Sequence, residues 1–255
     1  VIPNTEDFHA AIKVGLSNVQ NQKMVTFGIK PTHPETGYGY LELAKDFIDD
    51  SGTSDLEKFI EKPDLQDAKQ MMDAGHYLWN AGIFLFRARD MMDAFSTYVP
   101  ETLDLVSKAV TDASEDLGFL RLAPEPWSEL KDISIDYAIM EKAQNLVAVP
   151  YASKWSDLGG WDAVWAESSP DTLGNVTSET AHAIECSNSL LRSESSGQQV
   201  VGIGLNDIIA IAMPDAVLVA PKDRAQDVKK AVELLKAKDI AQAEIFPKDH
   251  RPWGW

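Results

Sequence analysis

The chain has 255 residues, 44% of them hydrophobic, and its 23 Lys and Arg against 40 Asp and Glu give a formal net charge of −17. The apolar fraction excludes a wholly disordered chain, and the acidic balance disfavours nucleic acid and anionic membranes as partners, because both would repel it. No apolar run approaches the ~20 residues that a membrane-spanning helix needs. A single cysteine, Cys186, and the lack of a secretory signal at the first residues favour a cytoplasmic location.

Strands and helices alternate along the first 170 residues, which predicts an α/β layer domain. Apolar residues three and four apart indicate a helix over residues 5–22, with Thr5 as its N-cap. Asp64 and Gly75 have the residue types that begin and end a short helix. The unbroken apolar run 82–86 suits a strand buried on both faces. The other predicted elements are strands at 24–29, 40–43, 56–61 and 146–149 and helices at 135–143, 160–166 and, with interruptions at Pro100, Gly118, Pro124 and Pro126, over 91–130.

The pattern changes after Pro170. Five short strand candidates lie within residues 174–221, separated by Asn, Asp, Gly and Ser turns, and no helical period is present between them. This spacing predicts a small β-rich module over 171–240, closed by a helix at 223–237. No internal repeat is evident in its sequence.

Two of the short polar clusters in the first part of the chain carry residue types suited to a ligand site. In the loop 35–40, Gly37 and Gly39 would let backbone N–H groups approach a ligand, although a Gly-x-Gly pair is also an ordinary turn. Glu61 and Lys62 follow a predicted strand, where they could hold a sugar hydroxyl and a phosphate. A solvent-exposed strand end would explain the same pair.

Three further residues are candidates for chemistry, each with a structural alternative. Asn80 precedes the apolar run, where its amide could read hydroxyl groups or tie down its own turn. Asp157 lies at a strand-to-helix junction, where a carboxylate suits Mg²⁺ or a helix N-cap. Asp136 lies in the first turn of a predicted helix, which favours a carboxylate with or without a substrate. The histidines lack metal-ligand spacing, and Cys-x-x-Cys, Gly-x-Ser-x-Gly and Walker motifs are absent.

In their order along the chain, these clusters resemble the motifs of the sugar-1-phosphate nucleotidyltransferases, and most closely the bacterial mannose-1-phosphate guanylyltransferases. The resemblance covers nearly the whole chain. It is carried by the segments 26–29, 35–40, 59–63, 79–84, 134–141, 155–159, 175–176 and 251–254.

The resemblance implies a Rossmann-like (GT-A-like) mixed sheet with helices, here lacking its N-terminal strands, over residues 1–170. It also implies a left-handed β-helix-like module over 171–240, which is the candidate contact for a homo-oligomer. Residues 241–255 would then be a linker or the start of a truncated isomerase (cupin) domain.

The reaction implied by the resemblance is GTP plus mannose 1-phosphate giving GDP-mannose and diphosphate, dependent on Mg²⁺, in nucleotide-sugar biosynthesis for surface polysaccharides. Lys62 and Asp157 would be the catalytic residues, and this role requires that they converge around a phosphorylated hexose. The implied site consists of Lys62 for the sugar phosphate, Glu61 and Asn80 for mannose hydroxyls, the backbone at Gly37 and Gly39 for the sugar, Asp136 as a further substrate contact, and Asp157 for Mg²⁺.

The family's Gly-rich N-terminal signature, with the Arg and Lys that grip the nucleotide, has no counterpart here, and neither has its first metal-binding Asp. We therefore expect a piece of a longer protein that is poorly active alone. Two alternatives stay open. One is a catalytically incomplete regulatory or assembly module derived from this family, and the other is a related enzyme that uses another hexose 1-phosphate.

Overall fold

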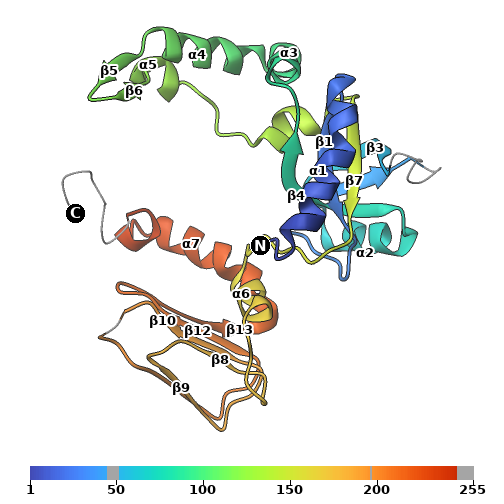
Figure 1. Cartoon of the computed structure of the whole chain (residues 1–255). Helices are drawn as coiled ribbons and strands as arrows, with labels where there is room; N and C mark the ends of the chain where they lie inside the picture. Colours follow the sequence, from blue (N-terminus) through green and yellow to red (C-terminus); the bar gives the residue numbers. More distant parts are fainter. Residues whose placement is uncertain (45–51, 196, 246–255) are drawn as a thin grey trace. The chain divides into compact units, whose positions relative to one another are not determined.

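The chain folds into two compact units (Figure 1). One is formed by residues 2–155, and the other by Val1 together with the residues from Ser156 onward. The structure is a computed structural model, and the residues that it describes are 1–44, 52–195 and 197–245.

The units separate before Ser156, earlier in the chain than the change of sequence pattern at Pro170. The reason is that helix α6 (Trp161–Glu167) packs on the β-rich region through Trp161 and Trp165. Residues 251–254, which carry the last family motif, lie outside the described residues.

The first unit is built on a mixed sheet whose strand order is β1-β4-β2-β3-β7 and which closes on itself. Strand β1 pairs antiparallel with β4 and parallel with β7, while β3 pairs antiparallel with β2 and with β7. The strands are β1 (Met24–Ile29), β2 (Tyr40–Leu43), β3 (Ser54–Ile60), β4 (Tyr77–Leu85) and β7 (Leu146–Tyr151). Each overlaps a predicted strand, although β4 also includes Asn80, which was predicted to precede its strand.

The core of this unit lies on both faces of the sheet, because β1 is buried along its whole length. Val25, Phe27 and Ile29 pack on one face with helices α1 (Thr5–Gln20) and α2 (Leu65–Ala74). Met24 faces the other side and packs with Ile139. Each such fully buried side chain contributes about 1.5–3 kcal/mol of transfer free energy.

The ends of the two helices test the predicted caps. Asn4, not Thr5, caps α1, since its side-chain oxygen accepts a hydrogen bond from the Glu6 backbone N–H at 3.1 Å. The prediction for α2 is confirmed: the Asp64 side chain caps its first turn, and Gly75 ends it in the left-handed region with φ +79°. The Asn4 cap was overlooked because Asn4 and Thr5 are both good N-cap residues.

Strand β4 begins earlier and is less buried at its end than predicted. Trp79, Asn80 and Ala81 are its buried residues, whereas Ile83 and Phe84 are only half-buried. The prediction of a run buried on both faces is therefore wrong. The physical reason is that β2 covers only the first part of β4, so its later residues pair with β1 alone.

The region predicted to be mainly helical between residues 91 and 130 contains a β-hairpin. Leu117 and Gly118 both have positive φ (49° and 85°), the conformation that a two-residue hairpin turn requires. Gly118 was predicted only as an interruption. The elements in this stretch are α3 (Ala88–Tyr98), α4 (Pro100–Thr111), β5 (Ser114–Asp116), β6 (Phe119–Arg121) and α5 (Pro124–Ser128), followed by a π-helical turn, η1 (Asp136–Met140).

The second unit contains the predicted β-rich module, whose strands stack in coils. Strands β8, β10 and β12 lie parallel side by side, and β9 and β11 form a second parallel pair. This is the arrangement of a β-helix, as predicted. The elements are β8 (Val176–Thr177), β9 (Ala181–Ile184), β10 (Leu190–Ser193), β11 (Val200–Ile203), β12 (Ile208–Ala212), β13 (Val217–Pro221), a 3₁₀-helical segment η2 (Lys222–Asp227), α7 (Val228–Lys236) and η3 (Ala241–Ala243).

The coils repeat a left-handed backbone conformation at their corners, although their sequences show no repeat. Asn188 and Asp207 occupy equivalent corners with φ of 49° and 54°, and Ser187 forms a parallel bridge with Asn206. The backbone repeats while the residue types differ, so no repeat is visible in the sequence.

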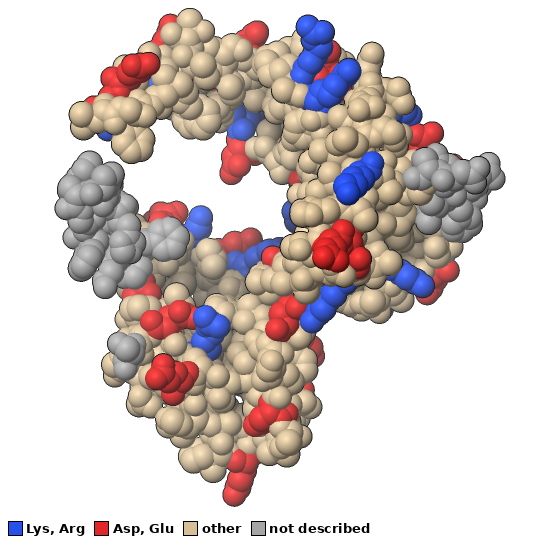
Figure 2. All heavy atoms as spheres, viewed as in Figure 1, with Lys and Arg blue, Asp and Glu red and all other residues tan. Residues whose placement is uncertain are grey.

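Charged side chains of both signs are spread over the visible surface of the two units. On the face shown in Figure 2, acidic and basic side chains are interspersed and do not gather into one patch. Among the described residues, no helix combines the length and apolar character needed to cross a bilayer.

Removal of the buried Asn175 side chain should destabilise the β-rich module. Its Nδ2 donates to the Cys186 carbonyl at 2.8 Å, and its Oδ1 accepts from the Ser189 N–H at 3.2 Å. Asn175→Ala leaves two buried backbone groups unpaired, which costs about 1–3 kcal/mol each. Thermal unfolding should show a lower Tm than for Asn206→Ala, a matched change at a less buried corner. Equal Tm values for the two variants would contradict this account.

Candidate active site

Three neighbouring strands of the first unit bring Gly39, Asn80 and Glu61 together. Gly39 precedes β2 and Glu61 follows β3, and these strands pair so that Tyr40 lies opposite Ile60. The Asn80 N–H, in β4, donates to the Gly39 carbonyl at 2.8 Å. A Cβ placed on Gly39 would lie 2.6 Å from Glu61 Oε2, so only glycine allows this approach.

Glu61 and Lys62 form an ion pair at this edge. Lys62 Nζ lies 2.6 Å from Glu61 Oε1, and the Glu61 side chain is 6% exposed against 45% for Lys62. The hydrogen bond to Glu61 raises the pKa of the Lys62 ammonium, partial burial opposes it, and the charges of Glu61, Tyr137 and Asp136 add to the rise. The ammonium is therefore charged at neutral pH.

Asn80 is held on two sides and faces Asp136. Its Oδ1 accepts hydrogen bonds from the Thr26 hydroxyl at 2.8 Å and from the Gly82 N–H at 3.1 Å, so the amide does tie down its own turn. Its Nδ2 lies 3.4 Å from Asp136 Oδ1. The two interpretations of Asn80 are thus compatible, because one end of the amide fixes the turn while the other faces Asp136.

The loop around Gly37 is fixed by its own side chains. The Gly37 N–H donates to the Glu35 carboxylate at 2.7 Å, and the Tyr40 hydroxyl bonds both backbone groups of Glu35. The Tyr38 ring packs edge-on against Trp79 at a centroid distance of 5.2 Å. A sugar contact through the Gly37 backbone stays a prediction, and its N–H group is already engaged.

Two residues at the site had no predicted role. Glu141 Oε1 accepts a hydrogen bond from the Glu61 backbone N–H at 3.0 Å, which joins η1 to the end of β3. Thr26, fully buried in β1, bonds Asn80. Both stand inside the motifs that carry the family resemblance, and this was the one signal that could have found them.

Asp157 belongs to the second unit. Its Oδ1 accepts a hydrogen bond from the Gly159 N–H at 2.8 Å, and the N-cap of α6 is Gly160, without a side-chain bond. The helix-cap interpretation of Asp157 is therefore wrong. An exposed carboxylate suits Mg²⁺, which keeps several waters and takes one or two protein carboxylates. In the part of the chain that the structure describes, no group of three or more His, Cys, Asp or Glu could hold a metal.

The structure thus brings together five of the seven predicted site residues within the first unit. The convergence of Lys62 with Asp157 around a hexose phosphate stays a prediction, as does the Mg²⁺ site. The five residues are Gly39, Glu61, Lys62, Asn80 and Asp136.

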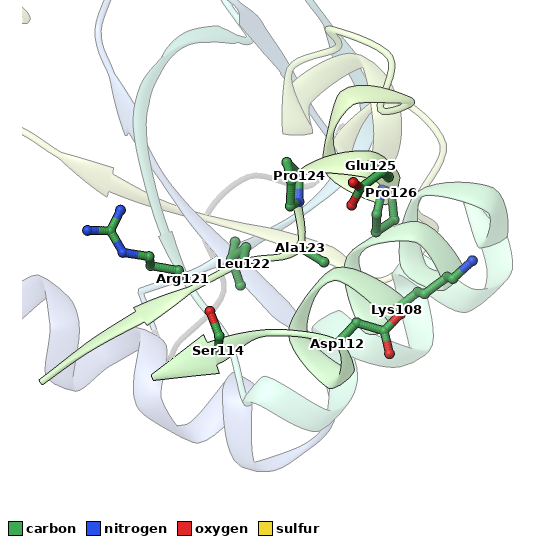
Figure 3. Close-up of a pocket in the computed structure, with 9 residues that line it drawn as sticks. All are labelled: Lys108, Asp112, Ser114, Arg121, Leu122, Ala123, Pro124, Glu125 and Pro126. Atoms are coloured by element: carbon green, nitrogen blue, oxygen red, sulfur yellow. The ribbon is translucent and has the colours of Figure 1, made fainter. Parts of the chain in front are cut away.

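A separate pocket of about 630 Å³ lies between α4, the β5–β6 hairpin and α5 (Figure 3). Charged side chains of both signs line it, among them Lys108, Asp112, Arg121 and Glu125. None of the predicted site residues contributes to this pocket, so it lies apart from the cluster around Gly39.

Comparison with known families identifies the family and confirms the fold. The family model described as "Nucleotidyl transferase" matches residues 4–174, and the chain belongs to this family. A second model, described as "MannoseP isomerase/GMP-like beta-helix domain", matches residues 181–235. The predicted fold, a nucleotidyltransferase mixed sheet followed by a β-helix-like module, is thereby confirmed.

Several curated relatives match the chain along its length. A mannose-1-phosphate guanylyltransferase of Klebsiella pneumoniae is 36% identical over 255 residues, which is 100% of this chain and 54% of that protein. The enzyme of that name called RfbM in Salmonella typhimurium is 37% identical, over 100% of this chain and 52% of its own. The xanthan biosynthesis protein XanB of Xanthomonas campestris is 36% identical, over 100% and 53%. The chain spans about half the length of these relatives.

Two solved structures are also similar. A structure described as mannose-1-phosphate geranyltransferase from Thermus thermophilus has a TM-score of 0.76 and 29% identity, covering 92% of this chain and 67% of its own. A mannose-6-phosphate isomerase from Helicobacter pylori has a TM-score of 0.55 and 29% identity, covering 62% and 60%.

Gly39→Ala should separate Glu61 from Lys62. The added methyl group would meet Glu61 Oε2 at 2.6 Å, so the carboxylate, at the flexible end of its side chain, must move away. The displaced carboxylate should let the pKa of Lys62 fall back toward its ordinary value, which NMR titration of the ammonium measures. Gly197→Ala is the control, because nothing lies within 4 Å of its added Cβ. A Lys62 pKa that stays unchanged in Gly39→Ala would refute the close approach.

Proposed function

We propose that the protein carrying this chain transfers a guanylyl group from GTP to mannose 1-phosphate, giving GDP-mannose and diphosphate. The observation that carries the proposal is the Lys62 ammonium beside the hydroxyl-binding groups of Glu61, Asn80 and Asp136. A cation next to neutral and anionic groups that bond hydroxyls suits a phosphorylated sugar. The choice of mannose as the sugar and guanine as the base is supported by the matched relatives named mannose-1-phosphate guanylyltransferase.

The chemistry requires positioning more than acid–base groups. A phosphate oxygen of the sugar phosphate, already ionised near neutral pH, attacks the α-phosphorus of GTP, so no protein base is needed. The new P–O bond joins the sugar phosphate to the guanylyl group, and the bond to the β-phosphate breaks to release diphosphate. Lys62 neutralises and orients the attacking phosphate, while Glu61 and Asn80 hold the hexose. Alignment and charge neutralisation supply the catalysis.

Two polyanionic substrates must approach a chain with a net charge of −17. When bound, Mg²⁺ would neutralise charge on the phosphates, and Asp157 would be its protein ligand from this chain. Lys62 supplies the positive charge beside the hexose site.

The wider setting is part of the same proposal. GTP and a sugar phosphate are metabolites of the cytoplasm, which supports that location, and the relative named for xanthan biosynthesis supports a role in polysaccharide formation. Strands β9 and β11 expose Ile184, Val201 and Ile203, with 48%, 55% and 65% of their surfaces accessible. This apolar face supports a homo-oligomer through the β-rich module.

Lys62→Met should selectively weaken binding of the sugar phosphate. Loss of a charge-assisted hydrogen bond costs about 1.5–3 kcal/mol, so the Kd for mannose 1-phosphate should rise about tenfold or more. Tm should also fall, because the buried Glu61 carboxylate loses its ionic partner, so the Kd values are compared at a temperature where both variants are folded. Isothermal titration measures the Kd, with Lys58→Met, an exposed change on β3, as the control. Unchanged affinity, or equal affinity of the wild-type protein for glucose 1-phosphate, would count against the proposed substrate.

Asp157→Asn should alter the dependence on Mg²⁺. The amide keeps the shape of the side chain and its bond to Gly159, but it removes the charge that a hard cation prefers. The Mg²⁺ concentration for half-maximal activity should rise about tenfold, equivalent to about 1.4 kcal/mol. Diphosphate release at varied Mg²⁺ measures it, and Asp215→Asn, an exposed change in a turn, is the control. The metal assignment fails if the two variants have the same Mg²⁺ dependence.

A further inference from the structure

Thr26 is a buried polar residue in β1 whose side chain contacts Asn80 in the neighbouring strand β4. It is 0% exposed, and in β1 it lies opposite Phe84 of β4. Gly28 lies opposite Asn80, and the register of the two strands shifts between these pairs. Such irregularities re-aim side chains next to functional sites. Here the irregularity accompanies a Thr26 hydroxyl that lies 2.8 Å from Asn80 Oδ1.

The orientation of the Asn80 amide follows from its neighbours. The Gly82 backbone nitrogen can only donate, and it lies 3.1 Å from the amide atom that also faces Thr26. That atom is therefore the oxygen, and the Thr26 hydroxyl must donate to it. Gly82 makes this contact with φ +68°, a conformation that glycine adopts readily.

The two bonds occupy both lone pairs of Asn80 Oδ1, so the amide has only N–H groups left for a ligand. Asn80 Nδ2 lies 3.4 Å from Asp136 Oδ1, and an ionised carboxylate is an acceptor only. A ligand group that bonds both must accept from Asn80 and donate to Asp136. A hydroxyl does both, whereas a fluorine cannot donate.

We propose that Thr26 is a positioning residue that fixes the Asn80 amide with its N–H groups toward the bound sugar. Asn80 then donates a hydrogen bond to a sugar hydroxyl, and the same hydroxyl donates a hydrogen bond to Asp136. The inference rests on the proposed function, because it takes the ligand to be a hexose 1-phosphate. Thr26 acts through Asn80 and touches no substrate atom.

Three variants of the full protein test this role. Thr26→Val keeps the shape of the side chain and removes the hydroxyl, Thr26→Ser keeps the hydroxyl, and Thr53→Val is the matched control at another buried threonine of the same unit, 3% exposed. Isothermal titration with mannose 1-phosphate gives Kd, steady-state kinetics gives KM for each substrate, and thermal unfolding gives Tm. The signals of the Asn80 side-chain NH₂ in ¹⁵N NMR report the orientation of the amide without any ligand.

Thr26→Val should raise the Kd and the KM for mannose 1-phosphate about fivefold, the loss of one hydrogen bond, and leave the KM for GTP unchanged. Thr26→Ser should restore wild-type values, and Thr53→Val should leave both KM values unchanged. The Asn80 NH₂ signals should shift or exchange faster in Thr26→Val alone. A purely structural role would instead lower Tm and affect both substrates together, and Thr26→Ser would not rescue it selectively.

Other outcomes overturn the inference. It fails if Thr26→Val binds mannose 1-phosphate as the wild type does, if Thr26→Ser is as impaired as Thr26→Val, or if the Asn80 signals are the same in all variants. If the wild-type protein itself does not bind mannose 1-phosphate, the proposed function fails. The Asn80 signals still decide separately whether Thr26 orients the amide.

Discussion

The hydrogen bond from the Asn80 N–H to the Gly39 carbonyl is the contact on which the site depends, because it joins the turn before β2 to the middle of β4. With β2 also paired to β3, the same geometry brings Glu61 against Gly39. Gly39, Asn80 and Glu61, which are far apart in the chain, thus come together through backbone pairing. The side chains then need no flexible loop to hold them, which favours a pre-formed site.

Acidic groups outnumber basic ones around this contact, and the arrangement of Glu61 explains how the site tolerates that. One carboxylate oxygen of Glu61 holds Lys62, while the other lies at Gly39, and the Glu61 backbone N–H donates to Glu141. The buried carboxylate is therefore paired, as a buried charge must be. The same pairing keeps the Lys62 ammonium charged, so that it can meet a phosphate at neutral pH.

The sequence allowed much of this to be predicted where the information is local. Asp64 and Gly75 bounded a helix because capping depends on residue type, and strands in the first unit followed from apolar runs. The hairpin turn at Leu117 was missed because a non-glycine residue with positive φ is rare. The exposure of Ile83 was missed because burial of a strand depends on which neighbours extend beside it, and the sequence does not state strand pairing.

For the candidate site, residue types and family resemblance identified Gly39, Glu61, Lys62, Asn80 and Asp136, which the fold brings together. Their supporting contacts were not predictable. A threonine in a buried strand and a glutamate at a helix end indicate only packing and solvation until the tertiary structure shows what they bond. Positioning residues are therefore harder to find from sequence than the residues they position.

The stacked coils of the second unit carry a consequence for how this protein family can vary in length. Each coil rests on its neighbours through parallel strands and repeated left-handed corners, so its stability comes from nearest-neighbour contacts. Loss or insertion of a coil would then disturb mainly the coils beside it and the helix α6 that packs on them. The nucleotidyltransferase sheet, closed by β3 and β7, has no such freedom, because removing one strand would open the ring.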